Sequence, residues 1–131
     1  MNQVLLDTHT WLFAVSAPKR LSAKARKLLS EPSNEMYLSV ASIWEMAIKM
    51  SVGKLEMGHV GDLDVFVTSL NASIGVKTLP ISVADACSVL TLPWYHRDPF
   101  DRMLVAQARA NNLVLVSKDT ELKRYGVKVL W

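Results

Sequence analysis

The sequence predicts an α/β fold, a three-layer α/β/α sandwich with a central, mainly parallel sheet. Three features of the chain point to this fold. Short apolar runs alternate with segments whose apolar residues recur at helical spacing. The apolar runs are continuous, which is typical of strands that are buried on both faces of a parallel sheet. Residues that cap or stop helices stand at the ends of the helical segments.

The elements follow one another in a repeated strand-to-helix order. The expected strands are residues 4–6, 36–38, 76–79, 113–116 and 127–130. The expected helices are residues 11–15, 23–29, Ser39 to a stop near Gly53, Asp62 to a stop near Gly75, Ser82 to a stop before Leu92, 100–110 and 120–125. The polar residues 8–10 are expected to separate the first strand from the first helix, and residues 55–61 form a loop rather than a domain boundary.

Local capping signals support several of these boundaries. Ser22 is a suitable N-cap for the helix that follows it. Ser82 and Asp85 have capping-box spacing, which gives Asp85 a complete local role. Asp98 precedes Pro99, and an N-cap followed by proline at the first helical position is a common way to begin a helix.

Composition limits the class of protein. The chain has 131 residues, 50% of them hydrophobic and 21% charged, so we expect one domain over residues 1–131 that can bury its own core. The composition excludes a disordered chain, and the single cysteine excludes a disulfide scaffold. The first apolar run is interrupted by Asp7 well short of a signal peptide or membrane span, so a cytoplasmic protein is expected. The formal net charge of +3 is compatible with a polyanionic partner.

Acidic residues follow two of the predicted strands. Asp7 comes directly after the first strand, and Asp119 comes shortly after strand 113–116. In open parallel sheets, ligands bind beyond the carboxyl ends of the strands. Neither turn has the glycine pattern of a dinucleotide or P-loop site, so those functions are excluded.

Two further acids are expected at the same edge. Glu45 lies on the helix that follows the second strand, and Asp101 lies in the first turn of the helix that leads to strand 113–116. Converging carboxylates suit Mg²⁺ or Mn²⁺, which prefer oxygen ligands and assist phosphodiester hydrolysis. Each acid also has a structural alternative: Asp7, Asp101 and Asp119 could act in helix capping, and Glu45 could pair with Lys49.

Four stretches resemble PIN-domain proteins in order and spacing, and are most similar to VapC-type toxins of prokaryotic toxin–antitoxin pairs. They are residues 5–9, 39–49, 96–108 and 116–119, of which the D-P-F-D-R block at 98–102 is the most specific. The resemblance covers essentially the whole chain. It implies an endoribonuclease that depends on Mg²⁺ or Mn²⁺, acts on RNA, forms a homodimer and is inhibited by a cognate antitoxin protein.

The resemblance also implies catalytic and metal-binding roles for the four acids. Asp7 and Asp101 would be direct metal ligands, and Glu45 would bind directly or through water. Asp119 would complete the cluster, with Glu121 as the alternative fourth acid. Asp98 is expected to be a helix cap.

Other polar and aromatic residues near this edge have weaker signals. Lys49, Arg97, Arg102 and Lys118 could contact the RNA backbone. His9 and His96 are left outside the catalytic set as surface or turn residues. Trp94 and Tyr95 could stack on an unpaired base, although packing in the core is the simpler expectation.

Two rival functions remain. The first is a PIN-type module that binds RNA or protein without catalysis. The second is a phosphohydrolase that acts on a small phosphate ester. The D-x-D-x-T pattern of one such group is absent at residues 7–10.

Overall fold

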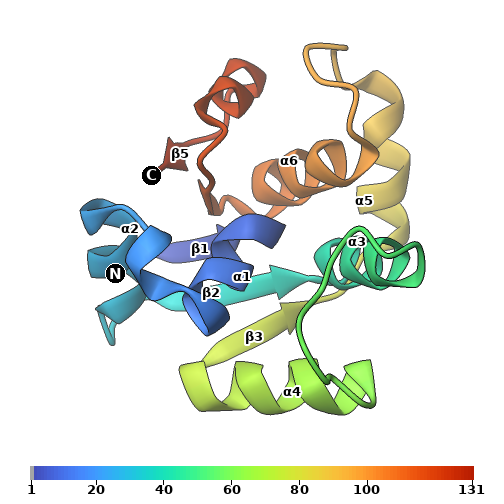
Figure 1. The fold of residues 1–131 in the computed structure, drawn as a ribbon. Coiled ribbons are helices and arrows are strands. Elements are labelled where there is room, and N and C mark those ends of the chain that lie inside the picture. The colour runs from blue at the N-terminus through green and yellow to red at the C-terminus, as the bar shows by residue number, and fades with distance from the viewer. Residues whose placement is uncertain (1) are drawn as a thin grey trace.

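The computed structural model describes residues 2–131, which contain a five-stranded sheet (Figure 1). The strand order is β3-β2-β1-β4-β5, and every pairing is parallel. The strands are β1 (Gln3–Leu6), β2 (Glu35–Ser39), β3 (Val76–Leu79), β4 (Val114–Val116) and β5 (Val129–Leu130). The predicted parallel α/β architecture is therefore confirmed.

Helices connect the strands. The α-helices are α1 (Thr8–Ser16), α2 (Ala23–Ser30), α3 (Val40–Ser51), α4 (Leu63–Ile74), α5 (Val83–Ser88) and α6 (Pro99–Asn111). Short 3₁₀ helices are η1 (Pro18–Arg20), η2 (Val89–Thr91) and η3 (Thr120–Tyr125). No helix within residues 2–131 has both the length and the apolar character needed to cross a membrane.

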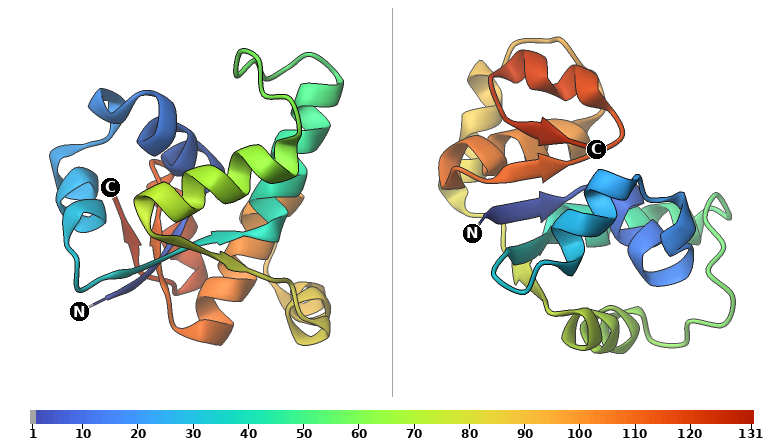
Figure 2. Two further views of the ribbon diagram at one scale, coloured as in Figure 1. Left: turned by 90° about the horizontal axis from the view of Figure 1, so that it is seen from below. Right: turned by 90° about the vertical axis from the view of Figure 1, so that its left-hand side faces the viewer.

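The central strand β1 separates two apolar cores. Leu5 packs into a core with residues of α6 and η3, whereas Val4 and Leu6 pack into a core with residues of α1, α2 and α4. All three side chains are fully buried. Figure 2 shows α5 and α6 on one side of the sheet and α1, α2 and α4 on the other. This arrangement explains the continuous apolar run in β1, because both faces of the strand are covered.

The parallel register brings several strand ends to one edge of the sheet. Leu6 of β1 pairs with Leu38 of β2 and with Val116 of β4. Figure 1 shows the arrowheads of β1, β2 and β3 pointing the same way. At this edge α1 and α3 begin directly after β1 and β2, so side chains in their first turns lie close to those that follow β4.

Some predicted boundaries were wrong. Helix α1 begins at Thr8 rather than after residues 8–10, because Asp7 caps it by accepting a hydrogen bond from the Thr10 backbone N–H. The last strand is shorter than predicted: Gly126 ends η3, and the strand begins only at Val129. The capping box of Ser82 and Asp85 is present as predicted.

Candidate active site at the carboxyl edge of the sheet

All four predicted acids, Asp7, Glu45, Asp101 and Asp119, border one cleft of about 480 Å³. The other residues that line it are Thr8, His9, Phe13, Arg20, Lys49, Asp98 and Lys118. The cleft lies where β1, β2 and β4 end. Glu121, the alternative fourth acid, is exposed in η3 and is not among the described residues that line the cleft. The structure thus brings together the acids that the sequence placed at this edge.

Asp7 joins the end of β1 to the start of α1. Its Oδ1 accepts the Thr10 N–H at 2.7 Å, and its own N–H donates to the Val116 carbonyl at 3.1 Å. The side-chain hydroxyl of Thr10 donates a hydrogen bond to the same carbonyl at 2.8 Å. Asp7 therefore performs the capping role and borders the cleft at the same time, so the two expectations for this residue are compatible.

Glu45 is buried on α3, with only 5% of the residue exposed. Its Oε1 accepts a hydrogen bond from the Thr8 hydroxyl at 2.6 Å, and its Oε2 lies 2.7 Å from Nζ of Lys49. The hydrogen bond to Glu45 raises the pKa of the Lys49 ammonium. Lys49, predicted as a possible RNA contact, is therefore engaged as the partner of a buried carboxylate.

Asp98 and Asp101 divide two tasks at the start of α6. Oδ1 of Asp98 accepts the backbone N–H groups of Phe100 at 2.8 Å and Asp101 at 3.1 Å, which confirms Asp98 as the helix cap. Because Asp98 satisfies the helix end, the Asp101 carboxyl is not needed for capping. It faces the cleft instead.

The electrostatics of Asp101 are unusual. Burial raises the pKa of its carboxyl from the ordinary 3.8 to about 7, and the negative charge of Asp98 adds to the rise. His96 opposes the shift, while Asp7 and Glu45 reinforce it. At Asp101 the neighbouring negative charges therefore outweigh the positive ones, and Lys49 is already paired with Glu45.

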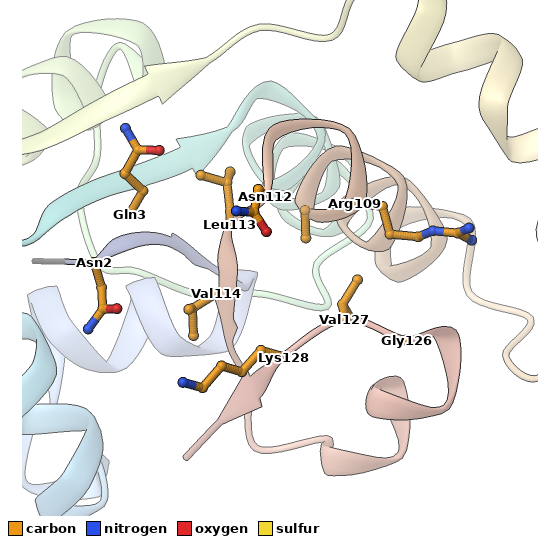
Figure 3. A pocket seen from close by; sticks show the side chains of 10 residues that line it. Asn2, Gln3, Arg109, Asn112, Leu113, Val114, Gly126, Val127 and Lys128 are labelled. Atoms are coloured by element: carbon orange, nitrogen blue, oxygen red, sulfur yellow. The ribbon is translucent and has the colours of Figure 1, made fainter.

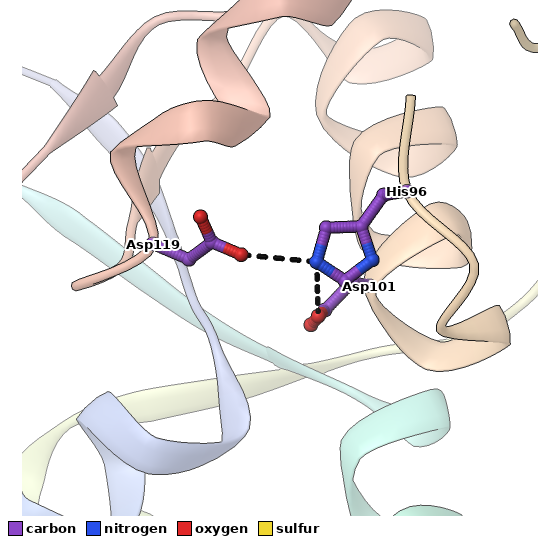
Figure 4. A group of neighbouring side chains, drawn as sticks. All are labelled: His96, Asp101 and Asp119. Atoms are coloured by element: carbon purple, nitrogen blue, oxygen red, sulfur yellow. Dashed lines mark hydrogen bonds and ion pairs between the residues drawn. The ribbon is translucent and has the colours of Figure 1, made fainter. Parts of the chain in front are cut away.

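Asp119 caps η3 and reaches His96. Its Oδ1 accepts the Glu121 N–H at 3.2 Å, and its Oδ2 lies 3.0 Å from Nε2 of His96. The same Nε2 lies 3.4 Å from Oδ2 of Asp101. Figure 4 shows the His96 ring beside both carboxyl groups.

His96 was predicted to lie outside the site, and the structure places it against two of the four acids. The available signal was its position two residues before Asp98, where the D-P-F-D-R block begins. That spacing alone does not show where the ring points, because it depends on the path of the loop from η2 to α6.

Arg102 was also misjudged. It is only 3% exposed, and its guanidinium donates to neutral backbone carbonyls of the preceding loop, including Pro93 at 2.8 Å and Leu92 at 3.2 Å. A group bound in this way cannot contact an RNA backbone, so that prediction was wrong. Trp94 lies over this guanidinium, 3.8 Å from ring centre to Cζ, and is 76% exposed, so the expected core packing was wrong as well.

The acid cleft fits a hard divalent cation. Its donors are carboxylate oxygens from four elements, which are the ligands that Mg²⁺ and Mn²⁺ prefer. The raised pKa of Asp101 agrees with this fit, since a cation beside Asp101 would offset the neighbouring negative charges.

A larger hollow of about 750 Å³ lies at the opposite edge, where β1 and β4 begin (Figure 3). Its polar side chains are amides such as Asn2 and Gln3, and its charged ones are Arg109 and Lys128. No acid is among the described residues that line it, so it offers no carboxylate for a metal ion.

Comparison with known proteins identifies similar sequences and structures. Residues 4–128 match the sequence model of the PIN domain. The chain is 27% identical over 126 residues to a protein named Ribonuclease VapC22 from Mycobacterium tuberculosis, covering 95% of this chain and 93% of that protein.

Two solved structures show a similar fold. The chain aligns with VapBC2 from Rickettsia felis bound to a promoter DNA fragment, with a TM-score of 0.68, 14% identity and coverage of 98% and 97% of the two chains. It aligns equally well with DNA-bound VapBC from Salmonella typhimurium, with a TM-score of 0.68, 18% identity and coverage of 99% and 98%. At sequence identities this low, the two alignments show that the fold is shared and nothing further.

Proposed function

Because this chain belongs to the PIN domain family, we propose that it is a divalent-metal-dependent endoribonuclease and the toxin of a toxin–antitoxin pair. The similarity to a protein named as a ribonuclease supports nuclease activity. The similarity to VapBC complexes supports an antitoxin partner. The observation that carries the proposal is the convergence of Asp7, Glu45 and Asp101 on one cleft, where the pKa of Asp101 rises to about 7.

Asp7, Glu45, Asp101 and Asp119 would hold the cation, Mg²⁺ or Mn²⁺. Bound there, the cation would supply an activated water and neutralise charge on the phosphodiester. Thr8 orients the Glu45 carboxylate through its hydroxyl. Asp98 satisfies the start of α6, which leaves the Asp101 carboxyl available to the cleft.

Cations at the rim would bind the RNA backbone. Lys118 is exposed and borders the cleft. Arg20, which was not predicted from the sequence, borders it too and lies over the Phe13 ring, 4.4 Å from Cζ to the ring centre. Their positive charges are suited to the phosphates of the RNA backbone, and contacts of this kind dominate the affinity of proteins for nucleic acid.

The test is incubation of the purified protein with total bacterial RNA in Mg²⁺ or Mn²⁺, followed by mapping of new RNA ends. We expect discrete cuts that vanish with chelator and in the Asp101→Asn variant. RNA binding without cuts would support the non-catalytic PIN module instead. Hydrolysis of a generic phosphomonoester would favour the small-ester phosphohydrolase.

An exposed apolar stripe on α3 supports the homodimer that the resemblance implies. Val40, Trp44 and Ile48 of α3 and Val52, directly after the helix, follow one another at four-residue steps and are 38–60% exposed. Such a stripe on a helix faces a partner more often than water. We place the self-association surface here and the protein in the cytoplasm, where its RNA substrate would be.

Light scattering coupled to gel filtration tests the dimer. We expect the mass of two chains for the wild type and of one chain for Trp44→Glu. Val65→Glu is the control, because Val65 is 61% exposed on α4, away from the stripe. Equal masses for Trp44→Glu and the wild type would place the contact elsewhere.

A further inference from the structure

His96 lies between two acids of the candidate metal site. Its Nε2 is 3.0 Å from Oδ2 of Asp119 and 3.4 Å from Oδ2 of Asp101 (Figure 4). The three side-chain atoms lie within 4.8 Å of one another, a separation that a single bound cation could span. The ring therefore stands in the space that a cation held by these two carboxylates would use.

The hydrogen bond on the other side of the ring decides which nitrogen carries hydrogen. Nδ1 of His96 accepts the backbone N–H of Asp98 at 3.2 Å. A ring nitrogen that accepts has no hydrogen of its own, so the hydrogen is on Nε2. Nε2 thus donates a hydrogen bond to Oδ2 of Asp119 and faces Oδ2 of Asp101 at 3.4 Å, so it has no lone pair available to a metal ion.

The backbone around His96 is held firmly. Its N–H donates to the Tyr125 hydroxyl at 2.9 Å, and its carbonyl accepts from Nη1 of Arg102 at 3.4 Å. Arg102 is buried and also bonds the carbonyls of Pro93 and Leu92. The loop that carries His96 is therefore fixed by α6 and η3, which explains how a loop residue can face two carboxylates.

We propose that His96 is an internal hydrogen-bond donor that competes with the divalent cation for the carboxylates of Asp101 and Asp119. In the metal-free protein the neutral ring presents its polar Nε2–H to both acids, which partly offsets the repulsion between their negative charges. A cation that binds both carboxylates must displace the hydrogen bond to Asp119 and the close contact with Asp101. His96 is thus a positioning residue that lowers metal affinity, an inference that rests on the proposed function.

The opposite role, a histidine ligand, predicts the opposite result. Removing a ligand weakens metal binding, whereas removing a competitor strengthens it. A hydrogen bond to a charged group stabilises the metal-free protein and so opposes metal binding. We therefore expect about a tenfold or greater decrease in the metal Kd when the Nε2–H donor of His96 is lost.

Two substitutions separate the donor from the rest of the ring. In His96→Asn the amide reaches only the Nδ1 position, so the bond from the Asp98 N–H can be kept while the donor to the carboxylates is lost. In His96→Gln the longer side chain can place an N–H near the Nε2 position. Calorimetric titration of the full chain with Mn²⁺ should give a Kd about tenfold lower for His96→Asn and near the wild-type value for His96→Gln.

A higher or unchanged Kd for His96→Asn would overturn the inference. Asp101→Asn is titrated in parallel to test the proposed metal site itself, and should lose binding. Loss in Asp101→Asn with no gain in His96→Asn would leave the proposed function standing and reject the role of His96. Absence of Mn²⁺ binding to the wild type would overturn both.

A second measurement needs no variant and so does not depend on the folding of one. In ¹⁵N-labelled wild-type protein, the side-chain nitrogen signals of the three histidines can be followed while diamagnetic Mg²⁺ is added. We expect His96 to carry hydrogen on Nε2 without metal and its Nε2–H signal to move as Mg²⁺ saturates the site. Hydrogen on Nδ1 alone, or an Nε2–H signal that does not move at saturation, would overturn the inference.

Discussion

The Thr8 hydroxyl donates a hydrogen bond to Oε1 of Glu45 at 2.6 Å and so joins the first turn of α1 to the middle of α3. Both residues are buried. The bond has two effects, because it compensates the burial of a carboxylate and fixes that carboxylate toward the acid cleft. Stability and metal binding should therefore depend on the same hydroxyl.

Replacing Thr8 by Val, which keeps the shape and removes the hydroxyl, should lower the free energy of unfolding by about 1.5–3 kcal/mol. The reason is that Oε1 of Glu45 loses its donor while it stays buried. Urea denaturation at neutral pH measures the change. Thr8→Ser retains the hydroxyl, so its free energy of unfolding should fall much less. Equal decreases for the two variants would mean that the hydrogen bond is not the cause.

The Asp101 carboxyl makes the metal-free protein less stable as pH rises. Its pKa in the folded chain is about 7, against 3.8 ordinarily, so between these values the folded state binds more protons than the unfolded state. The free energy of unfolding therefore falls as pH increases from about 4 to about 7, by at most about 4 kcal/mol, and is flat above that range with respect to this group.

Asp101→Asn removes this pH dependence. With chelator present, the variant should be more stable than the wild type at pH 7 and above, and the difference should vanish near pH 4. Unfolding midpoints across this range measure it, with Glu121→Gln as a control that removes an exposed acid outside the cleft. A constant difference at every pH would show that the burial of charge at Asp101 is not the cause.

Much of the fold could be predicted because its signals are local. The continuous apolar run at Leu5, the cap at Asp98 and the capping box at Asp85 each depend on neighbours within a few residues. Their parallel arrangement then followed from general rules of chain connection. The convergence of the acids on one cleft was predictable for the same reason, since strand ends determine it.

His96 and Arg102 were misjudged because their roles depend on the path of a loop. Arg102 is buried because the chain between α5 and α6 turns its carbonyls toward the guanidinium. His96 reaches Asp119 because η3 and that loop lie side by side. Neither relationship is periodic, and both join residues distant in sequence, so residue type and spacing could not reveal them.

Arg102 should act on stability rather than on RNA directly. Arg102→Lys should lower the free energy of unfolding by about 2–3 kcal/mol, because one ammonium cannot reach the several carbonyls that the planar guanidinium bonds at once. Thermal or urea denaturation measures the loss. Arg97→Lys, at an exposed position next to the same loop, is the matched control and should be near neutral. Similar stabilities for both variants would show that the buried bonds contribute little.

Lys118 should contribute to RNA affinity without regard to base sequence. It is exposed at the rim of the cleft, and neutralising one phosphate of a single strand contributes about 0.7 to the slope of log K against log salt. Lys118→Ala should therefore weaken binding to different RNA oligonucleotides by similar factors and reduce that slope by a little under one. Binding titrations measure both the RNA affinity and the salt slope. They are carried out in proteins that also carry Asp101→Asn, which is expected to prevent cleavage. Lys54→Ala, which removes an exposed cation outside the cleft, should leave the slope unchanged. If Lys118→Ala weakened binding to one RNA sequence alone, Lys118 would read a base rather than the backbone.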